Sequence, residues 1–444
     1  MIKLISKLRN DKDFFEIFQK GGISFLIRIG GQIMGFLLSF IIAHYYGAQG
    51  LGSFVLAITV LRIFTLLAKL GLDTTSVRFI ASFAKQNKWK NISLFRRKTL
   101  VLLCITSVIS SLIMYILSQN ISLILNIRLQ YLQMASYFVL PMTFFVLHYQ
   151  SLKGLKKIAE FSFFYRMSQA TFTIISIYII SIFISDEIVP IYAYLSALLI
   201  VSVLSFISYK YWFIKSKKVN HEEIIENLKI KDILKISIPL MFAQSVQFVM
   251  AWTDKLMIGN MLDPESVAIY GVAFRFSMIV SITLMAVNSI AAPKFAEKFA
   301  MNDTNSMAKI AIQSSKLIFW TTLPFAAILL IFPKFFMGLY GIEFLVGFDV
   351  LRLLIIGRLI NAFSGSVGNL MQMSGQQNSY MSILIIGAII NIGLNLLLIP
   401  KYGIDGAAYA SIVSMSFWNL SMVYMVKKKF GFFTMYIPFI NKKL

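Results

Sequence analysis

The stretch LGSFVLAITVLRIFTLLAKLGLDTTS (residues 51–76) is long and apolar enough to cross a membrane, yet it carries Arg62, Lys69 and Asp73. A membrane-spanning helix needs about 20 mostly apolar residues. Runs of this kind recur along the chain of 444 residues, of which 58% are hydrophobic and only 14% charged. A soluble fold with that balance would have too little polar surface to face water. The sequence therefore predicts an all-α polytopic membrane protein.

Hydropathy predicts twelve transmembrane helices. They are residues 23–46, 51–76, 99–118, 130–150, 161–184, 190–214, 236–258, 266–290, 310–332, 348–372, 380–399 and 405–426. Membrane-spanning strands would alternate polar and apolar residues, which these runs do not. Residues 1–20 are polar and basic, and the first run is too long for a signal-peptide core, so no cleavable signal is expected.

The basic residues are distributed unevenly between the two sides of the predicted membrane domain. The net charge is +23, and 29 Lys and Arg residues lie in the segments that an N-inside topology places in the cytoplasm. The outer connections hold only Arg128, Lys334 and Lys401. This asymmetry is the positive-inside signature and predicts that both termini are cytoplasmic. It accounts for the basic excess without nucleic acid, and the single Cys104 excludes an intramolecular disulfide and argues against a metal site.

The chain divides into two halves of six spans each. We predict a cytoplasmic N-terminal amphipathic segment, a first lobe, a cytoplasmic linker, a second lobe and a cytoplasmic tail, at residues 1–22, 23–214, 215–235, 236–426 and 427–444. A shift of 216 residues pairs VRFIASFA with PKFAEKFA and supports two lobes related by a pseudo-twofold axis along the membrane normal. The tail is expected either to lie on the inner surface as well or to be partly disordered.

Ten basic residues lie in or beside the predicted spans: Arg28, Arg62, Lys69, Arg78, Arg166, Lys255, Arg275, Lys316, Arg352 and Arg358. An Arg at a helix centre costs at least about 2.5–3.5 kcal/mol on insertion scales, so a lipid-facing position is disfavoured. Helical spacing places several of them in polar stripes, such as Arg62, Thr65, Lys69, Asp73 and Ser76 on the second span. Several such stripes predict a wet internal cavity, and its excess of Arg over carboxylate favours an anionic substrate. The candidate substrate-binding residues are Arg28, Arg62, Arg275, Lys69, Arg166, Gln32, Gln244 and Arg358.

Some of these charges have a purely structural alternative. Arg28 lies close enough to the cytoplasmic end of its span for its side chain to reach the interface, as do Arg78 and Lys316. Lys69 and Asp73 are four residues apart and can form an ion pair on one helix, and Arg352 can pair with Asp349. Arg62 lies about 18 Å from the outer end of its span at 1.5 Å per residue, which is too deep for its side chain to reach the interface easily.

Catalytic and nucleotide-binding motifs are missing from the sequence. The three histidines are scattered, and GAQGLG (residues 47–52) falls at a predicted outer turn, where turn geometry explains the glycines. Active transport would then depend on an ion gradient or on the membrane potential. Asp254 is the candidate for coupling to H⁺ or Na⁺, with a structural pair to the neighbouring Lys255 as the alternative.

Three blocks resemble the bacterial polysaccharide transporters, the O-antigen flippase (Wzx-type) family of the multidrug/oligosaccharidyl-lipid/polysaccharide (MOP) exporter superfamily. They are HYYGAQGLGSFVLAITVLRIFTLLAKLGLDTTSVRFIA (44–81), LMIGNMLDPESVAIYGVAFRFSMI (256–279) and NSYMSILIIGAIINIGLNLLLIPKYGIDGAAYASIVS (378–414). The resemblance implies a V-shaped pair of six-helix bundles around a central cavity, as in multidrug and toxic-compound (MATE) exporters. The family's cavity-lining cations on spans 1, 2 and 8 would correspond to Arg28, Arg62 and Arg275.

The resemblance also implies a function and partners. The substrate would be an undecaprenyl-pyrophosphate-linked oligosaccharide, flipped from the cytoplasmic to the periplasmic leaflet of the bacterial inner membrane. Membrane lipids, a polysaccharide polymerase and a chain-length regulator would be its partners. The alternatives are a cation-coupled drug exporter of the same fold, which would need more embedded carboxylates, and a membrane-embedded glycosyltransferase, which would need a catalytic constellation.

Overall fold

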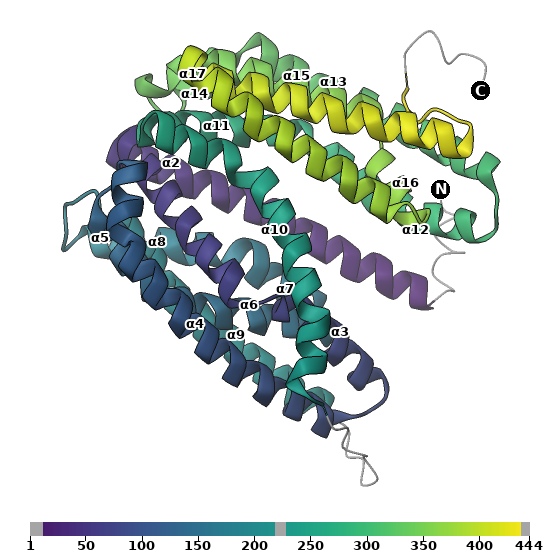
Figure 1. Cartoon of the computed structure of the whole chain (residues 1–444), viewed down its shortest axis with the longest axis horizontal. Helices are drawn as coiled ribbons and strands as arrows, with labels where there is room; N and C mark the ends of the chain where they lie inside the picture. Colours follow the sequence, from purple (N-terminus) through teal and green to yellow (C-terminus); the bar gives the residue numbers. More distant parts are fainter. Residues whose placement is uncertain (1–11, 218–227, 437–444) are drawn as a thin grey trace. The chain divides into compact units, whose positions relative to one another are not determined.

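The computed structural model describes residues 12–217 and 228–436, and every regular element in these ranges is a helix (Figure 1). The α-helices of the first half are α2 (Lys12–Ala68), α3 (Leu72–Lys85), α4 (Trp89–Leu125), α5 (Leu129–Ser136), α6 (Val139–Gly154), α7 (Ile158–Ser162), α8 (Gln169–Ser181) and α9 (Val189–Ser216). Those of the second half are α10 (Ile230–Met261), α11 (Pro264–Val280), α12 (Ile282–Ala300), α13 (Thr304–Ile331), α14 (Pro333–Gly338), α15 (Phe348–Ser364), α16 (Val367–Met373) and α17 (Gln377–Phe430). A π-helix, η1 (Phe163–Ser168), joins α7 to α8, and a 3₁₀-helix, η2 (Ile342–Gly347), precedes α15.

Six of these helices are long and apolar enough to cross a membrane, and the bent pair of α11 and α12 would be a seventh. Two of the six, α2 and α17, are of double length and each contains a break. The predicted all-α, multi-pass membrane class is therefore confirmed, whereas the count of twelve spans stays a prediction.

Glycine makes both breaks possible. Gly47 in α2 has φ 67° and Gly403 in α17 has φ 57°, a region that residues with a Cβ atom rarely adopt. Both glycines lie in connections that hydropathy places outside the membrane. In the first break the Glu343 carboxylate accepts a hydrogen bond from the backbone N–H of Ala48 at 2.9 Å. This bond satisfies an amide at the start of the second segment of α2 that has no partner within the helix.

The described residues divide by their contacts into two units. The first contains residues up to Tyr46 and Ser53–Gln247, and the second contains Gly47–Gly52 and residues from Phe248 onward. The division therefore falls within α10, whereas the sequence suggested a linker at 215–235, of which 218–227 lie outside the described residues.

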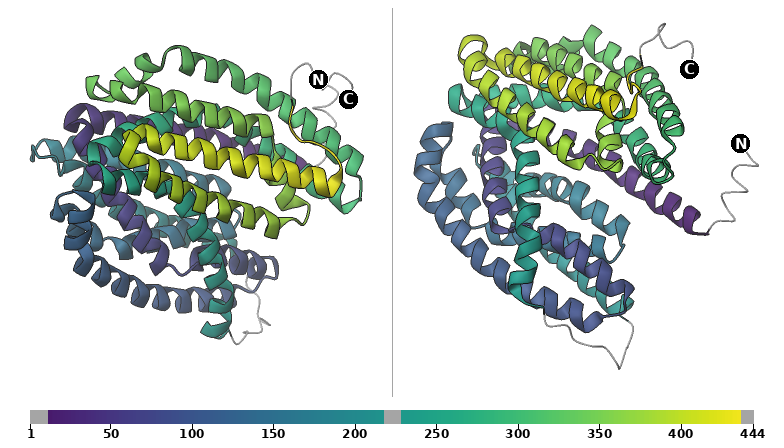
Figure 2. Two further views of the ribbon diagram at one scale, coloured as in Figure 1. Left: turned by 45° about the horizontal axis from the view of Figure 1, so that its top comes forward. Right: turned by 45° about the vertical axis from the view of Figure 1, so that its right-hand side comes forward.

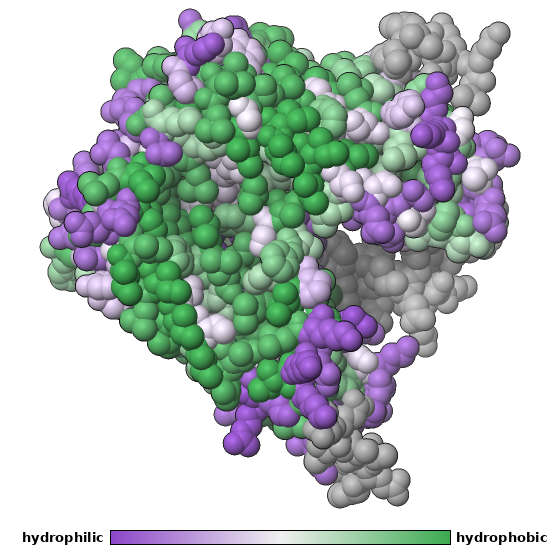
Figure 3. Space-filling view, in the orientation of Figure 1, coloured by the Kyte–Doolittle hydropathy of each residue, from purple (hydrophilic) through white to green (hydrophobic). Residues whose placement is uncertain are grey.

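The core of the first unit is built from α3, α4, α6 and α9. Large buried side chains from these helices, including Phe95, Phe145 and Tyr209, form one cluster. Two carbonyls near the end of α2 are satisfied by α4, because Thr106 donates to Ala68 O at 2.7 Å and Ser110 donates to Phe64 O at 2.9 Å. In Figure 3 the apolar surface over α4 lies between two polar ends, as expected for a membrane-spanning bundle.

The second unit packs α17 along α15, and α13 against both α12 and α15 (Figure 2). Local sequence starts two of its helices. Asp263 caps α11 by accepting a hydrogen bond from Ser266 N at 2.6 Å, and Asp303 caps α13 by accepting one from Ser306 N at 2.9 Å. The hydrogen bonds from Ser306 lower the pKa of Asp303.

The first residues of the predicted tail fold back into the second unit. Thr434 is 1% exposed, its carbonyl accepts a hydrogen bond from Ser315 of α13 at 2.6 Å, and its hydroxyl donates to Ser364 O of α15 at 3.1 Å. Gly365 has no Cβ, and this leaves room for Ser315. Residues 431–436 thus join α13 to α15, and residues 437–444 lie outside the described residues.

The topology predicts where reporter fusions will be active. Fusions after residues 125, 187 and 340 should report the extracytoplasmic side, and fusions after residues 90, 220 and 300 should report the cytoplasm. One inverted pair would show that a span has been miscounted.

The tail contacts predict a stability difference between two truncations. Ending the chain after Phe430 should lower the free energy of unfolding by about 1–3 kcal/mol, because two hydrogen bonds and a buried side chain are lost. Ending it after Tyr436 keeps these contacts and should leave stability unchanged in a thermal melt of the purified protein. Equal melting of the Phe430 truncation and the full chain would contradict the assigned role of Thr434.

Candidate functional site

The chain changes direction between α2 and α3 through two consecutive residues with positive φ. Leu70 has φ 48° and Gly71 has φ 73°. A non-glycine residue in this region is uncommon and strained, and such strain clusters at functional sites. The turn sets Lys69, the first residue after α2, beside the first turn of α3, which carries Asp73 and Thr74.

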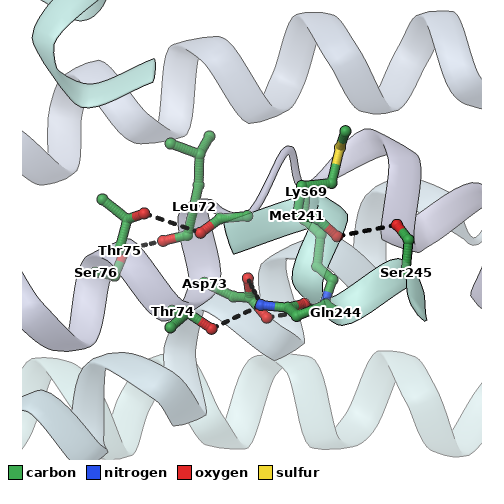
Figure 4. A network of polar contacts seen from close by, with 10 residues as sticks. Lys69, Leu72, Asp73, Thr74, Thr75, Ser76, Met241, Gln244 and Ser245 are labelled. Carbon is green, nitrogen blue, oxygen red and sulfur yellow. Dashed lines mark hydrogen bonds and ion pairs between the residues drawn. The ribbon is translucent and has the colours of Figure 1, made fainter. Parts of the chain in front are cut away.

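These three side chains and one residue of α10 form a closed polar network (Figure 4). The Lys69 ammonium donates to Asp73 Oδ2 at 2.7 Å and to Gln244 Oε1 at 2.8 Å. The Gln244 amide nitrogen donates to Asp73 Oδ1 at 3.2 Å and to Thr74 Oγ1 at 2.7 Å. The side chains of Lys69 and Asp73 are only 15% and 4% exposed. We call Lys69, Asp73, Thr74 and Gln244 the α10 network.

A glycine allows α10 to come this close. A Cβ built on Gly71 would lie 2.1 Å from Ser237 O and 2.8 Å from Met241 N, which is too close for any side chain. Only the bare backbone of Gly71 can therefore lie against α10. This approach brings Gln244, one turn beyond Met241, within reach of Lys69.

Arg62 lies two helical turns before Lys69 on α2 and is half-buried. Tyr149 of α6 is buried within electrostatic reach of both Arg62 and Asp73. Arg62 therefore lies in the same region of the first unit as the α10 network, and the polar stripe stays a prediction as a substrate-binding surface.

The first span and the π-helix η1 carry a second group of predicted residues. A Cβ on Gly31 would lie 2.7 Å from Arg166 O, so the two helices touch by their backbones. A buried hydrogen bond of 2.7 Å between the hydroxyls of Ser24 and Ser162 also joins them. Arg28, Gln32 and Arg166 are exposed. π-helical segments occur frequently at functional sites, and this one carries Arg166.

The second unit contains a carboxylate, Asp254, that accepts hydrogen bonds from four uncharged side chains. Asp254 Oδ1 accepts from the amide nitrogens of Asn391 at 3.1 Å and Asn395 at 2.8 Å. Asp254 Oδ2 accepts from the hydroxyls of Tyr270 at 2.6 Å and Ser411 at 2.5 Å. Asn395 is fully buried, and its Oδ1 has no hydrogen-bond partner within the described ranges. We call these five residues the Asp254 cluster.

A cation, Arg358, lies within electrostatic reach of this cluster. The Arg358 guanidinium lies 4.9 Å from the centre of the Phe274 ring and within electrostatic reach of Asp254 and Tyr270. Lys255 lies over the Trp252 ring at 4.3 Å, and Arg275 is half-buried on α11. The predicted pair of Arg352 and Asp349 is present at 3.3 Å, with both side chains about half exposed, so it is a surface contact.

The structure brings together some predicted residues and adds others. Lys69 pairs with Asp73, as one of the two alternatives proposed, and Gln244 joins them. Thr74, Tyr270, Asn391, Asn395 and Ser411 were missed. Asn391 and Asn395 are four residues apart on an apolar helix, so their spacing could have identified them as one polar face. Within the described ranges, no group of three or more His, Cys, Asp or Glu side chains could hold a metal ion.

Residues 17–299 match the family model described as polysaccharide biosynthesis protein. The chain belongs to this polysaccharide biosynthesis family. Residues 239–397 also match the MatE family model. The resemblance seen in the three sequence blocks is thereby confirmed at the level of the family and its superfamily.

Two curated relatives are 26% identical to this family member over part of its length. One is the probable low-salt glycan biosynthesis flippase Agl15 of Haloferax volcanii, matched over 167 residues, which are 37% of this chain and 35% of that protein. The other is an uncharacterized membrane protein of Methanocaldococcus jannaschii, matched over 290 residues, which are 63% of this chain and 52% of that protein. The matches thus span about a third and about half of these relatives.

Solved structures show that the family member has the MOP transporter fold. An inward-facing multidrug resistance MATE family transporter matches with a TM-score of 0.74 and 13% identity, over 92% of this chain and 98% of that one. The lipid II flippase MurJ in an inward closed conformation matches with a TM-score of 0.67 and 15% identity, over 92% and 87%. A MOP superfamily transporter from Pyrococcus furiosus matches with a TM-score of 0.61 and 16% identity, over 92% and 94%.

Proposed function

We propose that this protein is a flippase that moves an undecaprenyl-pyrophosphate-linked oligosaccharide, the repeat unit of O-antigen or a related surface polysaccharide, across a bacterial inner membrane. Transport would run from the cytoplasmic to the periplasmic leaflet by alternating access, with both termini of the protein in the cytoplasm. Membership of the polysaccharide biosynthesis family supports the glycan substrate. The relative described as a probable glycan biosynthesis flippase supports flipping as the activity. A polymerase and a chain-length regulator would act on the delivered repeat unit.

The observation that carries the proposal is the state of the two embedded acids. Asp73 is occupied by Lys69 and Gln244, and Asp254 accepts four hydrogen bonds from neutral donors. Asp73 is engaged by Lys69 and Asp254 is the candidate for the coupling ion, whereas a drug exporter of the same fold would need embedded carboxylates for the coupling ion and for a cationic drug as well. The predicted substrate-binding residues include six cations, which suit an anionic ligand: Arg28, Arg62, Lys69 and Arg166 in the first unit, and Arg275 and Arg358 in the second. Guanidinium groups suit a pyrophosphate because they bind phosphate oxygens in pairs.

Arg62 should be the cation on which transport depends most. Arg62→Ala should reduce surface polysaccharide in a complementation assay by about tenfold to a hundredfold, the factor expected from losing about 1.5–3 kcal/mol per hydrogen bond to a charged group. Arg62→Lys should keep part of the activity, because the charge survives but the paired geometry does not.

Two comparisons make this prediction decisive. Arg352→Ala removes an exposed arginine with a surface partner and should leave polysaccharide at the wild-type level. Membrane abundance of each variant separates a binding role from a folding role, because a structural arginine would lose folded protein and activity in parallel. Normal polysaccharide from well-expressed Arg62→Ala would exclude Arg62 from the transport path.

We further propose that the Asp254 cluster couples transport to an H⁺ or Na⁺ gradient. Its carboxylate, hydroxyls and amide oxygens are hard oxygen ligands, and the unpartnered Asn395 Oδ1 is an acceptor that a cation could use. Protonation or cation binding at Asp254 would rearrange hydrogen bonds on α10, α11 and α17 at once. An intramembrane carboxylate of this kind is a functional candidate by default.

Asp254→Asn should weaken the dependence of flipping on the coupling gradient, because the charge that attracts the cation is removed. The measurement is uptake of a fluorescent lipid-linked oligosaccharide into proteoliposomes with imposed proton or sodium gradients. Asp349→Asn, which changes an exposed acid, serves as the matched control. Unchanged flipping and unchanged response to both gradients in Asp254→Asn would exclude this role.

A further inference from the structure

The helix α10 belongs to both units of the chain. Its residues up to Gln247 make their contacts in the first unit, and its residues from Phe248 make theirs in the second. The helix contains Pro239, which removes one backbone hydrogen bond and allows bending. Contacts that fix the first half of α10 therefore restrain the helix through which the chain passes from the first unit to the second.

The first half of α10 is held by few apolar contacts. Between Ile230 and Gln247 only Ile233 and Ser237 are buried, and the other side chains are half-buried or exposed. Interhelical packing in a membrane depends on close backbone approach and on hydrogen bonds between helices. Here these are the contact of Gly71 with Ser237 and Met241, and the hydrogen bonds of Gln244.

Gln244 is held in place by hydrogen bonds to a charged pair, Lys69 and Asp73, and to Thr74. Its amide oxygen accepts from the Lys69 ammonium, and its amide nitrogen donates to Asp73 and Thr74, so both ends of the amide are in use. Lys69 itself has three N–H donors, of which two bind Asp73 and Gln244, and its side chain is 15% exposed. A phosphate group can first bind through the third donor, and each further contact that it makes with the ammonium replaces Asp73 or Gln244.

We propose that the α10 network is a latch on the first half of α10 that an anionic phosphate group releases by competing for Lys69. The inference rests on the proposed function, because the competing group is the pyrophosphate of the transported lipid. When Lys69 turns to the phosphate, Gln244 loses the donor to its amide oxygen and keeps its hydrogen bonds to Asp73 and Thr74, so α10 loses one of its interhelical hydrogen bonds. Substrate arrival thereby frees the helix that joins the two units.

Cross-linking tests whether the latch must open. In a Cys104→Ser background, Thr74→Cys and Gln244→Cys are joined with a short bifunctional thiol reagent, since the native side chains are in contact at 2.7 Å. Cross-linking with a bis-methanethiosulfonate should abolish the transport of a lipid-linked oligosaccharide that the same double-cysteine protein shows in proteoliposomes before cross-linking, and reduction of the disulfides should restore that level. The matched control joins Ser24→Cys to Ser162→Cys, whose native hydroxyls are also 2.7 Å apart in the first unit, and should leave transport intact. Full transport with the Thr74–Gln244 positions cross-linked would overturn the proposal.

Hydrogen exchange tests the release without any need for transport. Adding inorganic pyrophosphate to the purified full-length protein should raise exchange in residues 230–247 by about threefold, which corresponds to losing one interhelical hydrogen bond of about 0.6 kcal/mol. Lys69→Gln should abolish the response, and sodium chloride at equal ionic strength should not produce it. No response of the wild-type protein to pyrophosphate would overturn the latch. A pyrophosphate response in a protein that transports no lipid-linked oligosaccharide would support the latch and refute the proposed function.

Discussion

A charge placed at membrane depth has to be solvated by the protein itself, and this constraint shapes both units. The first unit meets it with an ion pair completed by an amide, in which Lys69, Asp73 and Gln244 satisfy one another. The second unit meets it with neutral groups, because four neutral donors surround the Asp254 carboxylate. A buried charge destabilises the fold unless hydrogen bonds or an opposite charge compensate for the lost water.

These polar groups reach one another because helices approach closely at glycines. Gly71 lets α10 touch the turn between α2 and α3, and Gly31 lets α2 touch the π-helix that carries Arg166. In a membrane the lipid tails are as apolar as the side chains, so close packing and hydrogen bonds hold helices together. The α10 network and Arg166 therefore lie at sites of backbone contact between helices.

The two acids have different partners, and this difference suggests that the two units respond to different ligands. Asp73 is neutralised by a lysine, so anions that compete for Lys69 can act on it. Asp254 is held by hydroxyl and amide groups, which would have to rearrange if the proposed coupling cation bound there. Both networks include α10, through Gln244 in the first unit and Asp254 in the second. A phosphate-sensitive contact and a cation-sensitive contact on one helix would allow substrate and ion to affect the same element.

The sequence by itself determined the membrane class, the position of the apolar helices and the set of embedded charges. It could do so because the bilayer imposes a fixed helix length and a high cost on charge, and both leave a mark in linear sequence. It also placed Lys69 and Asp73 on one stripe of a single helix. In the structure a sharp turn at Leu70 and Gly71 breaks that helix, but the two side chains still pair. Only the tertiary structure decided which partner each charge has. Gln244 lies 175 residues from Lys69, and Ser411 lies 157 residues from Asp254. Helical periodicity shows the face on which a residue lies, but the face that it meets depends on how the helices pack, and that depends on close contacts such as the one at Gly71.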